Sequence, residues 1–313
     1  MNFPFNDNPW HSLNLQSLKP LLKNASGFAF DLDGTLADNE GQALDLIRDI
    51  ISKHIVSLTE GEFEGLKSCY RHMAGHKLDD IIETAEIESE VLLTEDTRKA
   101  IKKDIAARRI SILKETTQCD PIRPLAALAH FIKQEGVPIC IVTASEQHRA
   151  EHFVRITGLD EIFTGNPKDW LFASNLKPKT DAHKVAQQRM SEIYDRRIDP
   201  LRWVGFEDSP SAVAQAIKAG AVVIPHTLCT HISEEHQPRR VMALQAAKLQ
   251  ELHTYTKKTK ITEFIQAGQG ILRPIQQPKD VLVIRSVDDI VPVVSATLNA
   301  IPLRVRLNGL TPA

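Results

Sequence analysis

The sequence has few aromatic residues and few cysteines. Aromatic side chains make up 5% of its 313 residues, and the four cysteines, Cys69, Cys119, Cys140 and Cys229, lie far apart. Zinc sites and disulfide-stapled domains need cysteines at short, paired spacings, so neither is expected. We therefore expect reduced thiols, mostly in the core, and a reducing compartment such as the cytoplasm.

A large excess of one charge and long apolar runs are also missing. The formal net charge is -2 and the isoelectric point is about 6.6, and no long basic run occurs. This balance disfavours strong attraction to nucleic acid or to an anionic membrane surface. No run of about 18 uncharged apolar residues is present, and residues 1–26 lack the charged and apolar regions of a secretory signal. We expect neither nucleic acid nor a membrane as partner.

What the sequence does have is an alternation of apolar strands with amphipathic helices. With 313 residues, of which 42% are hydrophobic, the chain is long enough for about two domains. Strands are predicted at 27–32, 137–145, 202–209 and 221–225, and helices at 125–136, 146–158, 181–194 and 210–220. Such alternation predicts the α/β class, with a doubly wound parallel sheet of the Rossmann-like kind.

Three segments depart from this alternation. Residues 42–117 are rich in charged segments of helical period, which predicts a helical insert between two core segments, 27–41 and 118–313. Residues 1–26 form an amino-terminal extension whose leucines predict a short amphipathic helix. The weak signals of residues 226–278 predict a further insertion, suited to a protein or self-association contact. After it we expect one more strand and a helix that Pro292 begins or bends.

The segment GFAFDLDGTL places two carboxylates, Asp31 and Asp33, directly after a buried strand. Ligands bind beyond the carboxyl ends of strands in a doubly wound sheet, and side-chain alternation puts both acids on one side. Gly34 permits the sharp turn that leaves them uncovered. Two carboxylates this close repel each other unless a cation or a proton intervenes. The pair therefore predicts a divalent metal, a proton-transfer role or both, whereas an ordinary turn explains only Gly34.

The other strand ends supply complementary groups. The hydroxyl of Thr143 and the backbone N–H groups from Ala144 onward lead into a helix, an arrangement that suits a phosphate oxygen but also ordinary helix capping. Glu207 and Asp208 add two more acids, which capping does not require. Lys177 precedes a proline and is expected in a loop, where its charge neutralises a phosphate or the acids.

Four segments in order, DLDGTL, VTAS, KPKTD and FEDSPSAVAQAIKAG, resemble the motifs of the haloacid dehalogenase superfamily. The resemblance covers about residues 27–225 and is to the branch of phosphatases and β-phosphoglucomutase-like enzymes, in which the helical insert is a cap domain. It implies a Mg²⁺-dependent phosphatase that hydrolyses a small phosphate monoester, such as a sugar phosphate, through an aspartyl-phosphate intermediate.

The resemblance also implies catalytic roles. Asp31 would be the nucleophile that attacks phosphorus, and Asp33 the general acid for the leaving oxygen and then the base for water. Thr143 would hold a phosphoryl oxygen beside Ala144. Lys177 would balance the charge of nucleophile and phosphate, and Lys179 is the weaker candidate for that role.

A metal site follows from the same resemblance. Mg²⁺ would bind Asp31, the backbone carbonyl of Asp33, and Asp208, with Glu207 beside it. The ion would neutralise charge so that a carboxylate can approach a dianionic phosphate.

Substrate choice in this branch is set mainly by the cap. Its segment CYRHMAGHKLDD carries Arg71, His76 and Lys77 around a glycine, which suits contact with an anionic ligand, although helix surfaces carry such residues for solubility as well. A small phosphorylated metabolite is the expected partner.

The sequence leaves three alternatives to a phosphatase. A dehalogenase needs no second acid, because a halide leaves without a proton, so Asp33 disfavours that activity. The β-phosphoglucomutases resemble one another in a histidine near the start of the cap. The comparable segment of this sequence, NEGQALDLIRD, has no histidine. Hydrolysis is favoured over the mutase. A non-catalytic binding protein that uses the same scaffold remains a third hypothesis, disfavoured because the full set of acids is present.

Overall fold

The computed structural model describes residues 13–54, 78–89, 91–175, 177, 179–226, 228, 283–284 and 286–309. Its centre is a five-stranded parallel sheet with the strand order β3-β2-β1-β4-β5. The strands are β1 (Gly27–Phe30), β2 (Ile139–Thr143), β3 (Leu171–Ala173), β4 (Trp203–Glu207) and β5 (Val222–Pro225). The predicted α/β fold with a parallel sheet is confirmed, and β3 is a strand that the sequence pattern did not predict.

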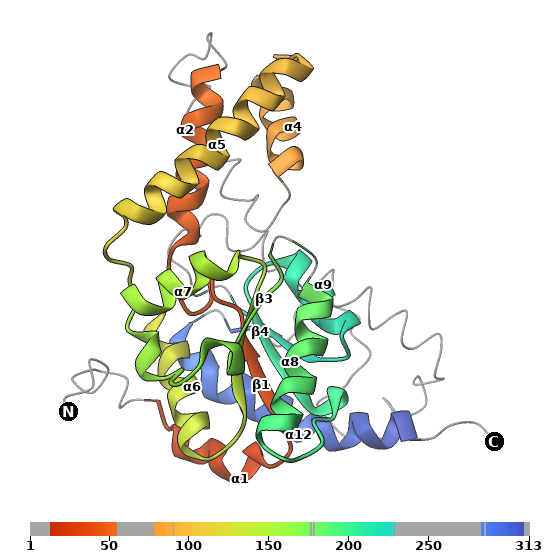
Figure 1. The fold of residues 1–313 in the computed structure, drawn as a ribbon. Coiled ribbons are helices and arrows are strands. Elements are labelled where there is room, and N and C mark those ends of the chain that lie inside the picture. The colour runs from red at the N-terminus through yellow and green to blue at the C-terminus, as the bar shows by residue number, and fades with distance from the viewer. Residues whose placement is uncertain are drawn as a thin grey trace.

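Helices cover both faces of the sheet (Figure 1). They are α6 (Arg123–Gln134), α7 (Gln147–Ile156) and α12 (Ile290–Gly309) on one face, and α8 (Lys179–Ile193) and α9 (Pro210–Lys218) on the other. Side-chain alternation along β1 sends Phe28 and Phe30 to the first face and Ala29 to the second. The Phe30 and Phe206 rings stack with centroids 4.7 Å apart, and this contact stabilises the packing of β1 beside β4.

A separate group of helices stands apart from the sheet layers (Figure 1). It comprises α2 (Glu40–His54), α4 (Leu78–Ser89) and α5 (Glu95–Glu115). These helices share their own apolar core, which includes Ile47, Ile51, Ile82 and Ile101. The chain enters α2 shortly after Asp33, so this helical unit is attached at the carboxyl end of β1.

Short elements complete the chain. The predicted amino-terminal helix is a 3-10 turn, Leu15–Leu18, followed by α1 (Lys19–Leu22), and its leucines Leu18 and Leu22 are buried. Further 3-10 turns occupy Leu159–Glu161, Pro167–Asp169, Pro200–Arg202 and Val287–Asp289. In the parts that the structure covers, no helix has the length and apolar character needed to cross a membrane.

The predicted carboxyl-terminal strand lies mostly outside the described residues. In its described part, Ile284 forms an isolated parallel bridge with His226. Pro292 lies in the first turn of α12, where a proline is tolerated because its missing N–H has no helical partner there. Nearly all of the predicted insertion 226–278 lies outside the described residues, so its proposed contact stays a prediction.

Candidate active site

The loop after β1 presents the two acids predicted from the sequence. The Asp31 N–H still donates to the Phe206 carbonyl at 3.0 Å, so Asp31 continues the pairing of β1 with β4. The chain then turns at Gly34, whose φ of 74° lies in the left-handed region that glycine favours. The Asp31 side chain is buried, and that of Asp33 is 20% exposed.

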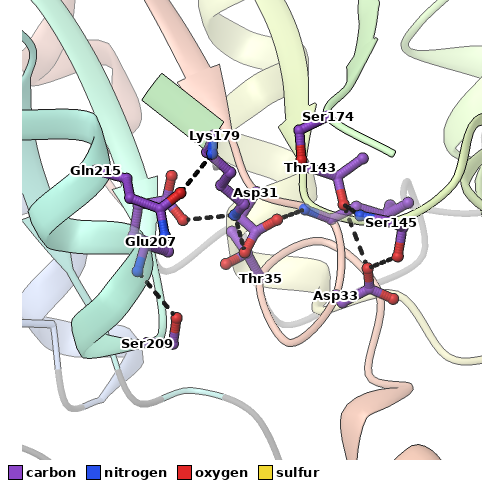
Figure 2. A network of polar contacts seen from close by, with 12 residues as sticks. Asp31, Asp33, Thr35, Thr143, Ser145, Ser174, Lys179, Glu207, Ser209 and Gln215 are labelled. Carbon is purple, nitrogen blue, oxygen red and sulfur yellow. Dashed lines mark hydrogen bonds and ion pairs between the residues drawn. The ribbon is translucent and has the colours of Figure 1, made fainter. Parts of the chain in front are cut away.

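Lys179 is the cation beside Asp31 (Figure 2). Its Nζ lies 2.6 Å from Asp31 Oδ2, and the other carboxylate oxygen, Oδ1, accepts the Leu32 N–H at 2.7 Å. Both side chains are almost completely buried. Each oxygen of the Asp31 carboxylate thus has a fixed partner, which orients the group.

The lysine expected in this place was Lys177, and the structure corrects that. Lys177 is exposed, and its N–H closes a turn by donating to the Ser174 carbonyl at 3.0 Å. Helix α8 begins at Lys179, so that side chain is the one that enters the site, and its N–H donates to the Gln215 side chain of α9. Because α8 begins two residues after Lys177, Lys179 and not Lys177 lies beside Asp31.

Glu207, predicted to lie beside the metal, contacts two side chains of α8 in this structure. Lys179 Nζ lies 2.9 Å from its Oε2, and His183 Nε2 lies 3.3 Å from its Oε1. Burial alone would raise the pKa of Glu207, but Lys179 and His183 hold it below its ordinary value. Glu207 therefore acts as the anchor of Lys179 in this structure.

Asp33 is held by four polar side chains. Its Oδ2 accepts from Ser145 Oγ at 2.5 Å and from Thr143 Oγ1 at 3.3 Å (Figure 2). Its Oδ1 accepts from Asn39 Nδ2 at 2.6 Å and lies 3.1 Å from Arg149 Nη2. Ser145, Asn39 and Arg149 were not predicted as site residues.

The phosphate-binding residues predicted at the end of β2 have different environments. Thr143 is fully buried, and its Oγ1 accepts the Ser145 N–H at 3.0 Å. Ala144 is exposed at the start of the turn into α7. At the end of β4, Ser209 caps α9 by accepting the Ala212 N–H at 3.4 Å.

The electrostatics of the site favour a cation. Burial raises the pKa of Asp31 well above its ordinary value, and the neighbouring charges of Glu207, Asp208 and Asp33 act in the same direction against Lys179. Four carboxylates thus face two cations, Lys179 and Arg149, in the described part of the site. An excess of carboxylate oxygen over positive charge is the setting in which a divalent cation binds.

The donor set fits Mg²⁺. No group of three His, Cys, Asp or Glu side chains with metal-binding geometry occurs in the described ranges. Mg²⁺ does not need one, because it is usually held by one or two carboxylates together with water and substrate phosphate. Asp31 and the buried Asp208, with the backbone carbonyl of Asp33, provide hard oxygen donors of that kind.

The three cap residues predicted to contact substrate, Arg71, His76 and Lys77, lie outside the described residues, so that contact stays a prediction.

Comparisons with known proteins agree with this geometry. The sequence model of haloacid dehalogenase-like hydrolases matches residues 25–220. A (DL)-glycerol-3-phosphatase 1, mitochondrial, of Arabidopsis thaliana is 26% identical over 201 residues, 62% of this chain. The match spans 61% of that relative's length.

Solved structures show the same fold. A haloacid dehalogenase family hydrolase from Deinococcus radiodurans R1, with bound phosphate and sodium, superposes with a TM-score of 0.55 at 18% identity, over 88% of this chain and 97% of that one. A haloacid dehalogenase-like protein of unknown function from Agrobacterium tumefaciens superposes with a TM-score of 0.51 at 21% identity, over 70% and 90% of the two chains.

Proposed function

Because the chain belongs to the haloacid dehalogenase-like hydrolases, we propose that it is a phosphatase that hydrolyses a small phosphate monoester through an aspartyl-phosphate on Asp31. The observation that carries the proposal is the buried contact between Asp31 and Lys179. The contact holds a carboxylate in a fixed orientation at the carboxyl end of the central strand, beside the cation that a bound phosphate would need.

In the first step, an Asp31 carboxylate oxygen attacks phosphorus and the bond from phosphorus to the ester oxygen breaks. Lys179 then lies beside both the nucleophile and the incoming negative charge. Asp33 enters this step in its protonated form, and the leaving oxygen takes that proton. The products of this step are the free alcohol and phosphorylated Asp31.

In the second step, Asp33 takes a proton from water as that water attacks phosphorus. The bond from phosphorus to Asp31 breaks, which releases inorganic phosphate and regenerates the carboxylate. Thr143 and Ser145 both bond to Oδ2 of Asp33, so they orient the group that moves the proton in both steps.

Phosphate binding uses the end of β2 and the start of α8. Thr143 and the backbone N–H at Ala144 bind phosphoryl oxygens in this proposal, and Lys179 neutralises the phosphate in place of Lys177. Asp31, Asp208 and the Asp33 carbonyl would hold Mg²⁺. When bound, that ion supplies positive charge that lets a carboxylate and a dianionic phosphate approach each other.

The substrate class is a small phosphorylated metabolite, either a sugar phosphate or a similar ester. Glycerol 3-phosphate belongs in the first panel because the curated relative is named for it. We keep the cytoplasm as the proposed compartment, on the strength of the scattered cysteines alone.

The test is phosphate release from a panel of small esters, measured with Mg²⁺ and with a chelator, for the wild type and for Asp31→Asn. We expect release from at least one ester, dependent on Mg²⁺ and lost in the variant. The amide keeps the shape of the carboxylate, so circular dichroism of the variant should match the wild type. Phosphate release by Asp31→Asn at the wild-type rate would reject Asp31 as nucleophile.

A further inference from the structure

His183 lies one helical turn after Lys179 on α8. The two residues are four positions apart, a spacing that puts side chains on one face of a helix. That face meets the end of β4, and both side chains are buried, His183 completely. Each of them contacts a different oxygen of Glu207.

The contacts form a continuous line to the nucleophile. His183 Nε2 lies 3.3 Å from Glu207 Oε1, Lys179 Nζ lies 2.9 Å from Glu207 Oε2, and the same Nζ lies 2.6 Å from Asp31 Oδ2. An ionised carboxylate only accepts hydrogen bonds, so Nε2 of His183 is the donor. With both oxygens bonded, the Glu207 carboxylate cannot rotate.

The other ring nitrogen indicates that packing alone does not explain His183. Its Nδ1 is buried without a hydrogen-bond partner among the described residues. An unpaired buried polar atom destabilises a folded protein. The neighbours of His183 on α8 that face the sheet, Ala182, Ala186 and Met190, are apolar, so an apolar side chain would avoid that penalty. The gain that offsets it is the contact with Glu207.

We propose that His183 is a positioning residue, which fixes Glu207 so that Lys179 stays against Asp31. The inference rests on the proposed phosphatase function for its kinetic consequences. His183 touches neither Thr143 nor Asp33 in this structure, so its loss should leave the positions of those two groups unchanged. The loss should instead let the Glu207 carboxylate rotate and Lys179 Nζ move away from Asp31. Small displacements of groups at the reacting centre slow a reaction strongly.

The test compares three variants with the wild type. His183→Phe keeps a flat ring without the donor, and His183→Gln restores an N–H donor at the end of the side chain. Gln187→Leu is the matched control, because Gln187 is also buried on α8 but bonds to the Ala219 carbonyl, away from the acids. Measurements are kcat and KM for phosphate release, the melting temperature, and a crystal structure of His183→Phe.

We expect kcat of His183→Phe to fall by about 10-fold to 100-fold, His183→Gln to recover most of that loss, and Gln187→Leu to keep the wild-type kcat. In the crystal, Lys179 Nζ should have left hydrogen-bond distance of Asp31. An equal kcat in His183→Phe and wild type, or no recovery in His183→Gln, would overturn the inference. If the wild type releases no phosphate, the proposed function fails, and the crystal structure of His183→Phe alone tests the positioning role of His183. Survival of the contact between Lys179 and Asp31 in that structure overturns the inference.

Discussion

Arg149 and Asp33 form an ion pair in which Arg149 Nη2 lies 3.1 Å from Asp33 Oδ1. The arginine also donates from Nη1 to Ser145 Oγ at 2.7 Å, and its guanidinium lies over the Phe153 ring at 5.1 Å from the centroid. Helix α7 thus supplies a cation with a fixed position to the acid that moves protons in the proposed reaction.

If Asp33 moves protons as proposed, this pair should set the pH dependence of the reaction. Burial alone would raise the pKa of Asp33, but Arg149 and the hydrogen bonds from Ser145 and Asn39 hold it below its ordinary value. Arg149→Met removes the cation, so the pKa of Asp33 rises. We predict that the limb of the pH–rate profile governed by Asp33 moves to higher pH. Arg155→Met, an exposed arginine on the same helix, should leave the profile in place. An unshifted profile in Arg149→Met would contradict the assignment of Asp33.

Lys179 and Lys177 should respond differently to the same substitution. Lys179→Met leaves Asp31 and Glu207 without their shared cation, so we predict a loss of kcat of about 100-fold or more. It should also destabilise the fold by about 3 kcal/mol, because buried charges lose their partner. Lys177→Met changes an exposed side chain and should alter neither quantity. Steady-state kinetics and urea unfolding of both variants check this. Equal losses in the two would restore Lys177 as the site lysine.

The thiol of Cys119 should react slowly with alkylating reagents. Burial, with the negative charges of Asp38 and Asp120, raises its pKa to about 12. Only the thiolate reacts with iodoacetamide, and at pH 8 very little thiolate forms. We predict slow alkylation of Cys119 in the native protein and fast alkylation in urea, measured by mass spectrometry of its peptide. Equal rates in both conditions would show that the folded environment does not protect the thiol.

Two glycines in the central strands should differ in their tolerance of a methyl group. A Cβ at Gly27 would lie 2.5 Å from Trp203 Cζ3, whereas one at Gly205 would meet nothing closer than 3.8 Å. We predict that Gly27→Ala lowers the free energy of unfolding by about 1 to 3 kcal/mol, because a packed core resists extra volume. Gly205→Ala should be close to neutral. Denaturant unfolding checks both, and similar stabilities of the two variants would contradict the packing described.

The sequence was sufficient to predict the parallel sheet and the acids at its carboxyl edge. Apolar runs such as residues 27–30 are bounded by polar residues, and strand ends of a parallel sheet meet at one edge, so Asp31, Thr143 and Asp208 could be placed there. These predictions depend on local pattern and on one general rule of topology.

The choice between Lys177 and Lys179 could not be made in that way. It depends on where α8 begins, which follows from the short strand β3 and the turn at Asn175, whose φ is 51°. A three-residue strand gives almost no periodic signal. Arg149 and His183 were missed for a related reason: a charged or polar residue on a helix usually faces solvent, and only tertiary packing turns these two toward the acids.

The most direct test of the account is to trap the phosphorylated enzyme. The wild type is mixed with a substrate found in the ester panel, quenched in acid within one turnover and reduced with borohydride, which converts an aspartyl-phosphate to homoserine. Peptide mass spectrometry then locates the homoserine. We expect homoserine at position 31 and at no other aspartate. Homoserine at another position, or none while phosphate is released, would contradict the assignment of Asp31 as the nucleophile.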